Sequence, residues 1–121
     1  MEELRLGVIE SQFAEIIWSN EPLLSGELVK LCEQKLGWKK STTYTVLKRL
    51  CERGIFQNEK GIVSALITKE EYDSAQSEKF LEENFGGSLP AFLAAFTRGK
   101  TLTREQQDTL QSLIDEARRK L

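Results

Sequence analysis

One segment, GWKKSTTYTVLKRL at residues 37–50, combines the apolar spacing of a helix with an unusual run of polar side chains. It holds five consecutive hydroxyl side chains, with two lysines before them and a Lys-Arg pair after them. Serine and threonine are mediocre helix-interior residues, because their hydroxyls compete for nearby backbone groups. Val46, Leu47 and Leu50 nevertheless recur at helical spacing. The pattern predicts a helix from about residue 41 to 53, with one apolar face and one face of hydroxyls and cations.

The outer face of this helix fits contact with DNA. Short donors and acceptors can reach base edges, and cations can bind phosphates. The residues predicted to contact DNA are Lys39, Lys40, Ser41, Thr42, Tyr44, Thr45, Lys48 and Arg49. The alternative is that Ser41 and Thr42 only cap the helix while Thr43 packs inward. We expect both descriptions to hold in part, because capping and contact use different residues.

The charge distribution supports this prediction more than the net charge does. The chain carries only −2 overall, yet from Lys39 to Arg53 five cations face one acid. A basic stripe on an acidic body can mark a nucleic-acid footprint. A solvated helix face would give the same pattern, so charge alone does not decide between them.

Length and composition predict an intracellular protein. A chain of 121 residues suits one compact domain, with room for a helical extension. No apolar run reaches the roughly 18 residues of a membrane span. Met1, Glu2 and Glu3 lack the cationic and apolar parts of a signal peptide. Cys32 and Cys51 both fall on apolar helix faces, which favours free buried thiols over a disulfide and predicts a cytoplasmic location.

The flanking segments complete a recognisable order of elements. Ile9, Phe13, Ile16 and Ile17 form one stripe of a helix that ends at Asn20. A second helix is predicted from an N-cap at Ser25 to a left-handed Gly37. Two β-prone runs, residues 55–57 and 62–67, flank a polar loop at residues 58–61 and predict a hairpin.

The rest of the chain is predicted to be helical. Thr68 with Glu71, and Thr103 with Gln106, have the spacing of capping boxes. They predict a helix from Thr68 to about Phe85 and a closing helix after Thr103. A short apolar helix that stops near Gly99 lies between them, after Gly86-Gly87.

This order predicts a mainly α fold: a winged helix-turn-helix of three helices and a short hairpin wing, followed by C-terminal helices. We expect a DNA-binding domain over residues 1–68 and a dimerisation region over residues 69–121. The recognition helix of such a domain enters the major groove, which is wide enough to admit it.

The last two helices carry more apolar surface than two short helices can hide. In a symmetric dimer these side chains would pack against their own copies. The residues predicted to form this interface are Phe92, Leu93, Phe96, Leu110, Leu113, Ile114 and Ala117. Packing on the winged helix is the alternative, and the Gly86-Gly87 break argues against it.

Several stretches resemble the penicillinase and methicillin-resistance repressors, the BlaI/MecI family. They are residues 11–56, from SQFAEIIW to ERGIF, and TKEEYDSAQSEKFLEENFGGSLPAFLAAF, residues 68–96. The resemblance covers nearly the whole chain. It implies a bacterial homodimeric repressor of a dyad-symmetric operator, whose recognition helix follows a tryptophan, here Trp38. It also implies a sensor pathway with a regulatory protease as a further partner.

The sequence departs from the family pattern at several points. The Ser-Pro-Lys that often follows the tryptophan is Lys39, Lys40 and Ser41 here. A frequent arginine of the recognition helix is Tyr44. The Asn-Phe bond cut in antibiotic-responsive members aligns with Ala95-Phe96, so the resemblance does not support cleavage there. No cysteine follows Cys51 and histidine is absent, which excludes the soft-metal site of copper-responsive members.

Two other functions compete with repression. Catalysis is disfavoured because the chain has no histidine, no Gly-rich phosphate loop and no nucleophile with an evident base. We therefore expect no enzyme activity, cofactor or metal. A winged helix can also serve as a protein-interaction module without specific DNA binding, since fold alone does not fix function. The cationic, hydroxyl-rich face of the third helix favours DNA.

Overall fold

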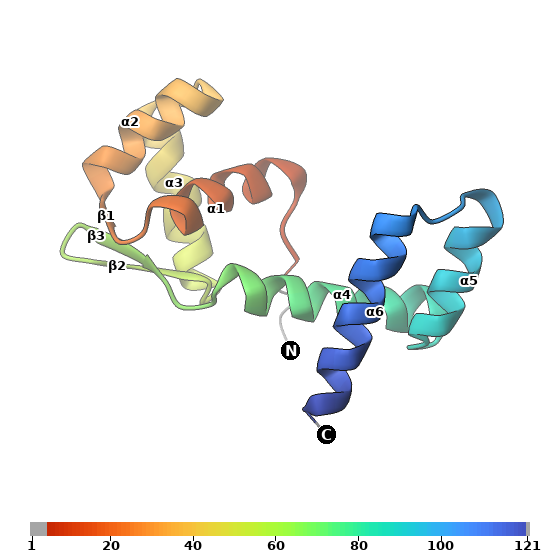
Figure 1. Ribbon diagram of the computed structural model, residues 1–121. Coiled ribbons are helices and arrows are strands. Elements are labelled where there is room, and N and C mark those ends of the chain that lie inside the picture. Colours follow the sequence, from red (N-terminus) through yellow and green to blue (C-terminus); the bar gives the residue numbers. More distant parts are fainter. Residues whose placement is uncertain (1–4, 121) are drawn as a thin grey trace. The chain divides into compact units, whose positions relative to one another are not determined.

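The computed structural model describes residues 5–120, so Met1, Glu2 and Glu3, on which the expected lack of a signal peptide rests, lie outside it. The described residues form six helices and three strands (Figure 1). In chain order these are α1 (Val8–Asn20), β1 (Leu23–Leu24), α2 (Ser25–Leu36), α3 (Lys40–Glu52), β2 (Phe56–Glu59), β3 (Ile62–Ala65), α4 (Lys69–Phe85), α5 (Leu89–Gly99) and α6 (Arg104–Arg119). The predicted mainly α class, a winged helix followed by C-terminal helices, is confirmed.

The described chain divides into two compact units. The first ends at Ser77 and the second begins at Glu78, so the division falls within α4. Among residues 5–120, no helix has both the length and the apolar character needed to cross a membrane.

The first unit is a three-helix domain with a small antiparallel sheet. The strands lie in the order β1-β3-β2, with Leu23 opposite Val63 and Phe56 opposite Ala65. One apolar core joins the helices and the sheet. Its largest fully buried side chains include Phe13, Ile17, Leu28, Leu47, Leu50, Ile55, Phe56 and Val63.

The predicted stripe of α1 is right except at its first position. Phe13, Ile16 and Ile17 are buried, whereas Ile9 is 58% exposed. Leu6, which precedes the helix, is only 7% exposed and belongs to the core cluster. We infer that Leu6 fills the part of the core beside the amino end of α1, a position that helical spacing had assigned to Ile9.

The start of α2 also differs by one residue from the prediction. Leu24 is the N-cap residue and Ser25 is already helical. The Glu27 carboxylate accepts a hydrogen bond from the Leu24 N–H at 3.4 Å, while the Ser25 N–H donates to the Gly61 carbonyl at 2.8 Å. The predicted N-cap at Ser25 is therefore wrong, because its amide joins the sheet. β1, only two residues long, was not predicted at all.

The hairpin is tighter than expected. Its turn is Lys60–Gly61, both with positive φ (52° and 86°), as two-residue hairpin turns of type I′ require. Asn58, which we expected in a loop, belongs to β2, and its Oδ1 accepts a hydrogen bond from the Gly61 N–H at 3.1 Å. The second strand ends at Ala65, short of the predicted Ile67. The N–H groups of residues 66 and 67 turn to the Ile55 carbonyl instead.

Both predicted capping boxes of the C-terminal half are confirmed. The Thr68 hydroxyl accepts from the Glu71 N–H, and the Glu71 carboxylate accepts from the Thr68 N–H, each at 3.0 Å. Thr103 and Gln106 bond each other in the same way before α6. The Thr68 hydrogen bonds lower the pKa of the Glu71 carboxyl, because they favour its charged form.

The second unit is small and open. None of its described residues, 78–120, is buried. Four phenylalanine rings contact one another in a chain of pairs 5.5–6.3 Å apart: Phe80, Phe85, Phe92 and Phe96. Asn84, before the Gly86-Gly87 break, donates from its side chain to the Phe80 carbonyl at 3.0 Å.

Candidate nucleic-acid interface

A three-residue turn, residues 37–39, sets the direction of α3. Gly37 has φ 68°, the left-handed conformation in which glycine ends a helix at no steric cost. The Trp38 ring then stacks on the Phe13 ring of α1, with centroids 5.4 Å apart and planes within 20°. α3 therefore begins at Lys40 against a fixed anchor in the core, close to the predicted start at residue 41.

The inner face of α3 is the predicted one. Thr43, Val46, Leu47 and Leu50 are all buried. The Thr43 hydroxyl donates to the Lys39 carbonyl at 3.3 Å, so its burial leaves no unsatisfied polar group. The half of the capping alternative that placed Thr43 inward is therefore confirmed.

The other half of that alternative is not. Lys39 is the N-cap residue of α3, and its side chain makes no capping hydrogen bond. Ser41 and Thr42 lie inside the first turn and are exposed. With no side-chain cap, the first backbone N–H groups of this helix suit an anion such as a phosphate.

The outer face of α3 carries most of the residues predicted to contact DNA. Exposed there or just before it are Lys39, Lys40, Ser41, Thr42, Thr45, Lys48 and Arg49. Tyr44 is the exception, since it is half-buried and packs against the core. Its hydroxyl donates to Ser25 Oγ at 3.1 Å. The outward orientation predicted for Tyr44 is therefore only partly right, because its side chain packs against the core and its hydroxyl bonds to the start of α2.

Glu10 of α1 forms ion pairs with both arginines of the basic stripe, residues 39–53. Its Oε2 lies 3.2 Å from Arg49 Nε, and its Oε1 lies 3.7 Å from Arg53 Nη1. Within residues 5–120, no carboxylate pairs with Lys39, Lys40 or Lys48. Of these three lysines, Lys39 and Lys40 lie at the amino end of α3 beside the exposed hydroxyls, and Lys48 lies two turns further along the helix.

The two cysteines offer no reactive site. Both are free thiols, as predicted; Cys32 is also buried as predicted, whereas Cys51 is only half-buried. Burial raises the pKa of the Cys32 thiol, and a hydrogen bond with Thr43 opposes this effect. Burial also raises the pKa of Cys51. Both thiols are therefore held in their protonated, weakly nucleophilic form.

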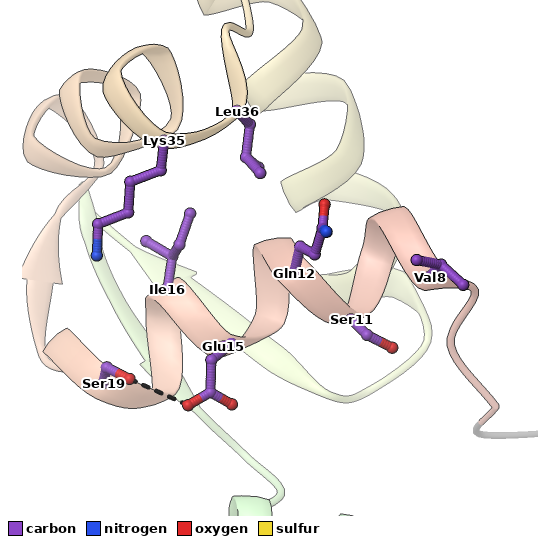
Figure 2. A pocket seen from close by; sticks show the side chains of 8 residues that line it. All are labelled: Val8, Ser11, Gln12, Glu15, Ile16, Ser19, Lys35 and Leu36. Atoms are coloured by element: carbon purple, nitrogen blue, oxygen red, sulfur yellow. Dashed lines mark hydrogen bonds between the residues drawn. The ribbon is translucent and has the colours of Figure 1, made fainter.

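A groove of about 650 Å³ lies between α1 and the end of α2. Figure 2 shows the side chains of Lys35 and Leu36 on one side and those of α1 on the other, with Ser19 bonded to Glu15. Its lining includes none of the residues predicted to contact DNA. No buried side-chain polar atom of the described residues lacks a hydrogen-bond partner, so no orphaned group there points to a ligand.

The second unit presents the predicted dimerisation residues as a hollowed apolar surface. A groove of about 590 Å³ between α5 and α6 is lined by Phe92, Leu93, Phe96 and Leu110 among others. Leu113 and Ile114 continue along α6 and are 56% and 49% exposed. Ala117 is exposed one turn further on. Within residues 78–120 these side chains are half-buried or exposed, and none is buried.

Two functional side chains were missed by sequence reasoning. Glu10 pairs with arginines 39 and 43 positions away, and Ser25 meets Tyr44 from 19 positions away. Periodicity places residues on faces of single elements, but it does not report which elements meet. The one available signal was that Glu10 is the acid nearest the apolar stripe of α1, and it is weak.

Comparison with known proteins gives the context of this geometry. A family model described as "Penicillinase repressor" matches residues 6–116. The penicillinase repressor of Bacillus licheniformis is 22% identical over 111 residues, which cover 88% of this chain and 87% of that protein. The family match spans both units, the exposed face of α3 and the apolar groove of α5 and α6. The chain therefore belongs to the penicillinase repressor family, a family of transcriptional repressors and not of enzymes.

Proposed function

We infer that this repressor binds a dyad-symmetric DNA operator as a homodimer, with α3 in the major groove of each half-site. The observation that carries the proposal is the division of α3 into two faces. One face is buried in the core, while the opposite face exposes hydroxyls and lysines that pair with no carboxylate of residues 5–120. An exposed helix of this composition has the dimensions and the chemistry to reach base edges and phosphates.

The roles within the interface follow from position. Lys39 and Lys40 stand at the uncapped amino end of α3, where a phosphate would also meet the positive end of the helix dipole. Ser41, Thr42 and Thr45 offer donors and acceptors for base edges. Lys48 extends the cationic surface along the same face. Arg49 shares its half-exposed guanidinium with Glu10, so DNA contact by Arg49 competes with that ion pair.

The homodimer is supported by the second unit. Its described residues bury no side chain, although they include the phenylalanine cluster and the exposed Leu113 and Ile114 of α6. Apolar surface of this extent normally marks an interface. In a two-fold symmetric dimer this surface of one copy would meet the same surface of the other, and two winged helices would then face one duplex. A regulatory protease or sensor pathway remains a further proposed partner, without cleavage at Ala95-Phe96.

Selection of bound duplexes from a random pool with the purified protein tests the proposal. We expect an inverted repeat, because each protomer would read one half-site. Recovery of a single unrepeated site would contradict the homodimeric mode, and no enrichment at low or moderate salt would contradict specific DNA binding. The second outcome would favour the alternative of a protein-interaction module.

A further inference from the structure

The first two turns of α4 are fastened to the winged helix by contacts that no DNA-reading role explains. The Tyr72 ring lies 5.5 Å from the Trp18 ring of α1, tilted by 40°. The Tyr72 hydroxyl accepts a hydrogen bond from the Leu6 N–H at 3.0 Å. Lys69 Nζ lies 3.7 Å from a Glu15 carboxylate oxygen. α4 thus starts from a fixed place on the first unit, although the second unit begins only at Glu78.

Trp18 is itself held from two other sides. Its Nε1–H donates to the Ile67 carbonyl at 2.9 Å, in the segment that leads into α4. Its ring also contacts the Phe56 ring of β2, with centroids 5.6 Å apart. Trp18 therefore links the core of the first unit to the beginning of α4.

The segment before α1 forms the other side of this attachment (Figure 1). Leu6 is buried in the core, and the Arg5 carbonyl accepts a hydrogen bond from Arg53 Nη2 at 2.8 Å. Tyr72 therefore bonds to residues 5–7, which we call the strap. The strap packs into the core through Leu6 and is hydrogen-bonded to Arg53 at the carboxyl end of α3. We call Tyr72, Trp18 and this strap the α4 clamp.

We propose that Tyr72 is a positioning residue that fixes the direction in which α4 leaves the winged helix, and thereby sets the half-site spacing that the homodimer accepts. The proposal rests on the proposed function. α4 has 17 residues and is therefore roughly 25 Å long. A tilt of about 10° at its start would move its far end by roughly 4 Å, about one base-pair step of DNA. One added base pair also turns a half-site by roughly 35° about the duplex axis, so a change in the direction of α4 should alter the relative affinities for operators of different spacing.

The test compares matched duplexes and matched variants. The duplexes are the selected operator, the same operator with one or two base pairs added or removed between half-sites, and an isolated half-site. Tyr72→Phe keeps the ring and removes the bond to Leu6. Ser77→Ala is the control, since it removes a hydroxyl of the same helix that bonds only to the Asp73 carbonyl within it. Trp18→Phe is a second variant, which keeps a ring and removes the bond to Ile67.

We expect Tyr72→Phe to lower the preference for the native spacing by about fivefold, the factor that one net hydrogen bond contributes. Half-site affinity and dimer mass should stay unchanged, and Ser77→Ala should behave as the wild type. The Leu6 amide should also exchange its hydrogen faster in Tyr72→Phe only. If Tyr72 only stabilised the winged-helix domain, Tyr72→Phe would instead lower the affinities for the half-site and for the full operator together.

Three results would overturn the proposal. They are an unchanged spacing preference in both Tyr72→Phe and Trp18→Phe, an equal loss on all duplexes, or unchanged Leu6 exchange in Tyr72→Phe. A wild-type protein that binds the half-site but shows no spacing preference refutes the positioning role alone. A wild-type protein that binds none of the duplexes refutes the proposed function, and the inference with it.

Discussion

The Tyr44 hydroxyl donates a hydrogen bond to Ser25 Oγ at 3.1 Å and joins α3 to the first residue of α2. The Ser25 N–H in turn donates to the carbonyl of Gly61 in the hairpin turn at 2.8 Å. Three parts of the winged-helix domain therefore meet at Ser25: the candidate recognition helix α3, the helix α2 before it and the β2–β3 hairpin. Tyr44 contributes to the shape of the interface as well as to its surface.

Tyr44→Phe is predicted to destabilise the protein while leaving base preference unchanged. The ring stays against the core, and only the bond to Ser25 is lost, which typically costs about 0.5–1.5 kcal/mol of the free energy of unfolding. Tyr44→Ala should lose more stability and also shift base preference. Urea unfolding and selection from random DNA measure the two effects. Wild-type stability with a changed base preference in Tyr44→Phe would show that the hydroxyl reads a base.

Thr45→Ala should change sequence preference with little effect on folding. Thr45 is exposed, and substitutions at such positions usually stay within about 0.5 kcal/mol of the wild-type free energy of unfolding. Loss of one direct base contact costs roughly 1–3 kcal/mol of discrimination. Thr43→Ala is the matched comparison from the buried face, where stability should fall. The reverse pattern, with Thr45 needed for folding, would mean that α3 is assigned the wrong face.

Lys39→Ala and Lys40→Ala should weaken binding to all DNA sequences alike. Each lost phosphate contact reduces the slope of log affinity against log salt by about one. Lys35→Ala, at the end of α2 in the groove beside α1, removes the same charge away from α3 and is the control. Titrations of specific and random duplexes at several salt concentrations give the slopes. An unchanged slope with an altered base preference would assign these lysines to base reading.

Glu10→Gln should strengthen DNA binding if Arg49 reaches a phosphate. The substitution releases the guanidinium from the Glu10 carboxylate, and the gain should vanish in an Arg49→Ala background. Exposed ion pairs contribute only about 0.2–1 kcal/mol to stability, so the fold should tolerate the change. Glu33→Gln removes an exposed acid of α2, away from α3 and α4, and serves as the control. An equal gain with and without Arg49 would reveal a general charge effect.

Much of this molecule could be predicted from local patterns. The buried face of α3, the capping boxes and the glycine end of α2 follow from periodicity and capping, which depend on residues within one or two turns. Ile9 was misplaced because Leu6, outside the helix, fills the core instead. β1 escaped prediction because two residues carry no period, and its pairing with β3 is decided 38–40 positions away.

The same distinction applies to the candidate DNA-binding site: features within one helix could be predicted, and contacts between elements could not. Exposure of Lys40, Thr42, Thr45 and Lys48, like the burial of Thr43, follows from their spacing in one helix. The bonds of Tyr44 to Ser25, of Glu10 to Arg49 and of Tyr72 to Leu6 depend on which elements meet in space. A half-buried tyrosine and an exposed one have the same place in a helical pattern, so the position of Tyr44 required the structure.

In the proposed homodimer, two copies of this chain join through α5 and α6 and bind two half-sites together. Phe96 is 41% exposed and lines the apolar groove of the second unit, so a charge there should leave the single chain folded but break the dimer. Val8→Glu places the same charge on an exposed apolar residue of the first unit and is the control.

Sedimentation of Phe96→Glu, followed by titration with the full operator and with one half-site, is the most direct measurement. We predict a monomer whose half-site affinity is unchanged. Its affinity for the full operator should fall by roughly 100-fold or more, because the second contact no longer gains from effective concentration. A variant that stays dimeric, or that binds the full operator as tightly as the wild type, would contradict the account.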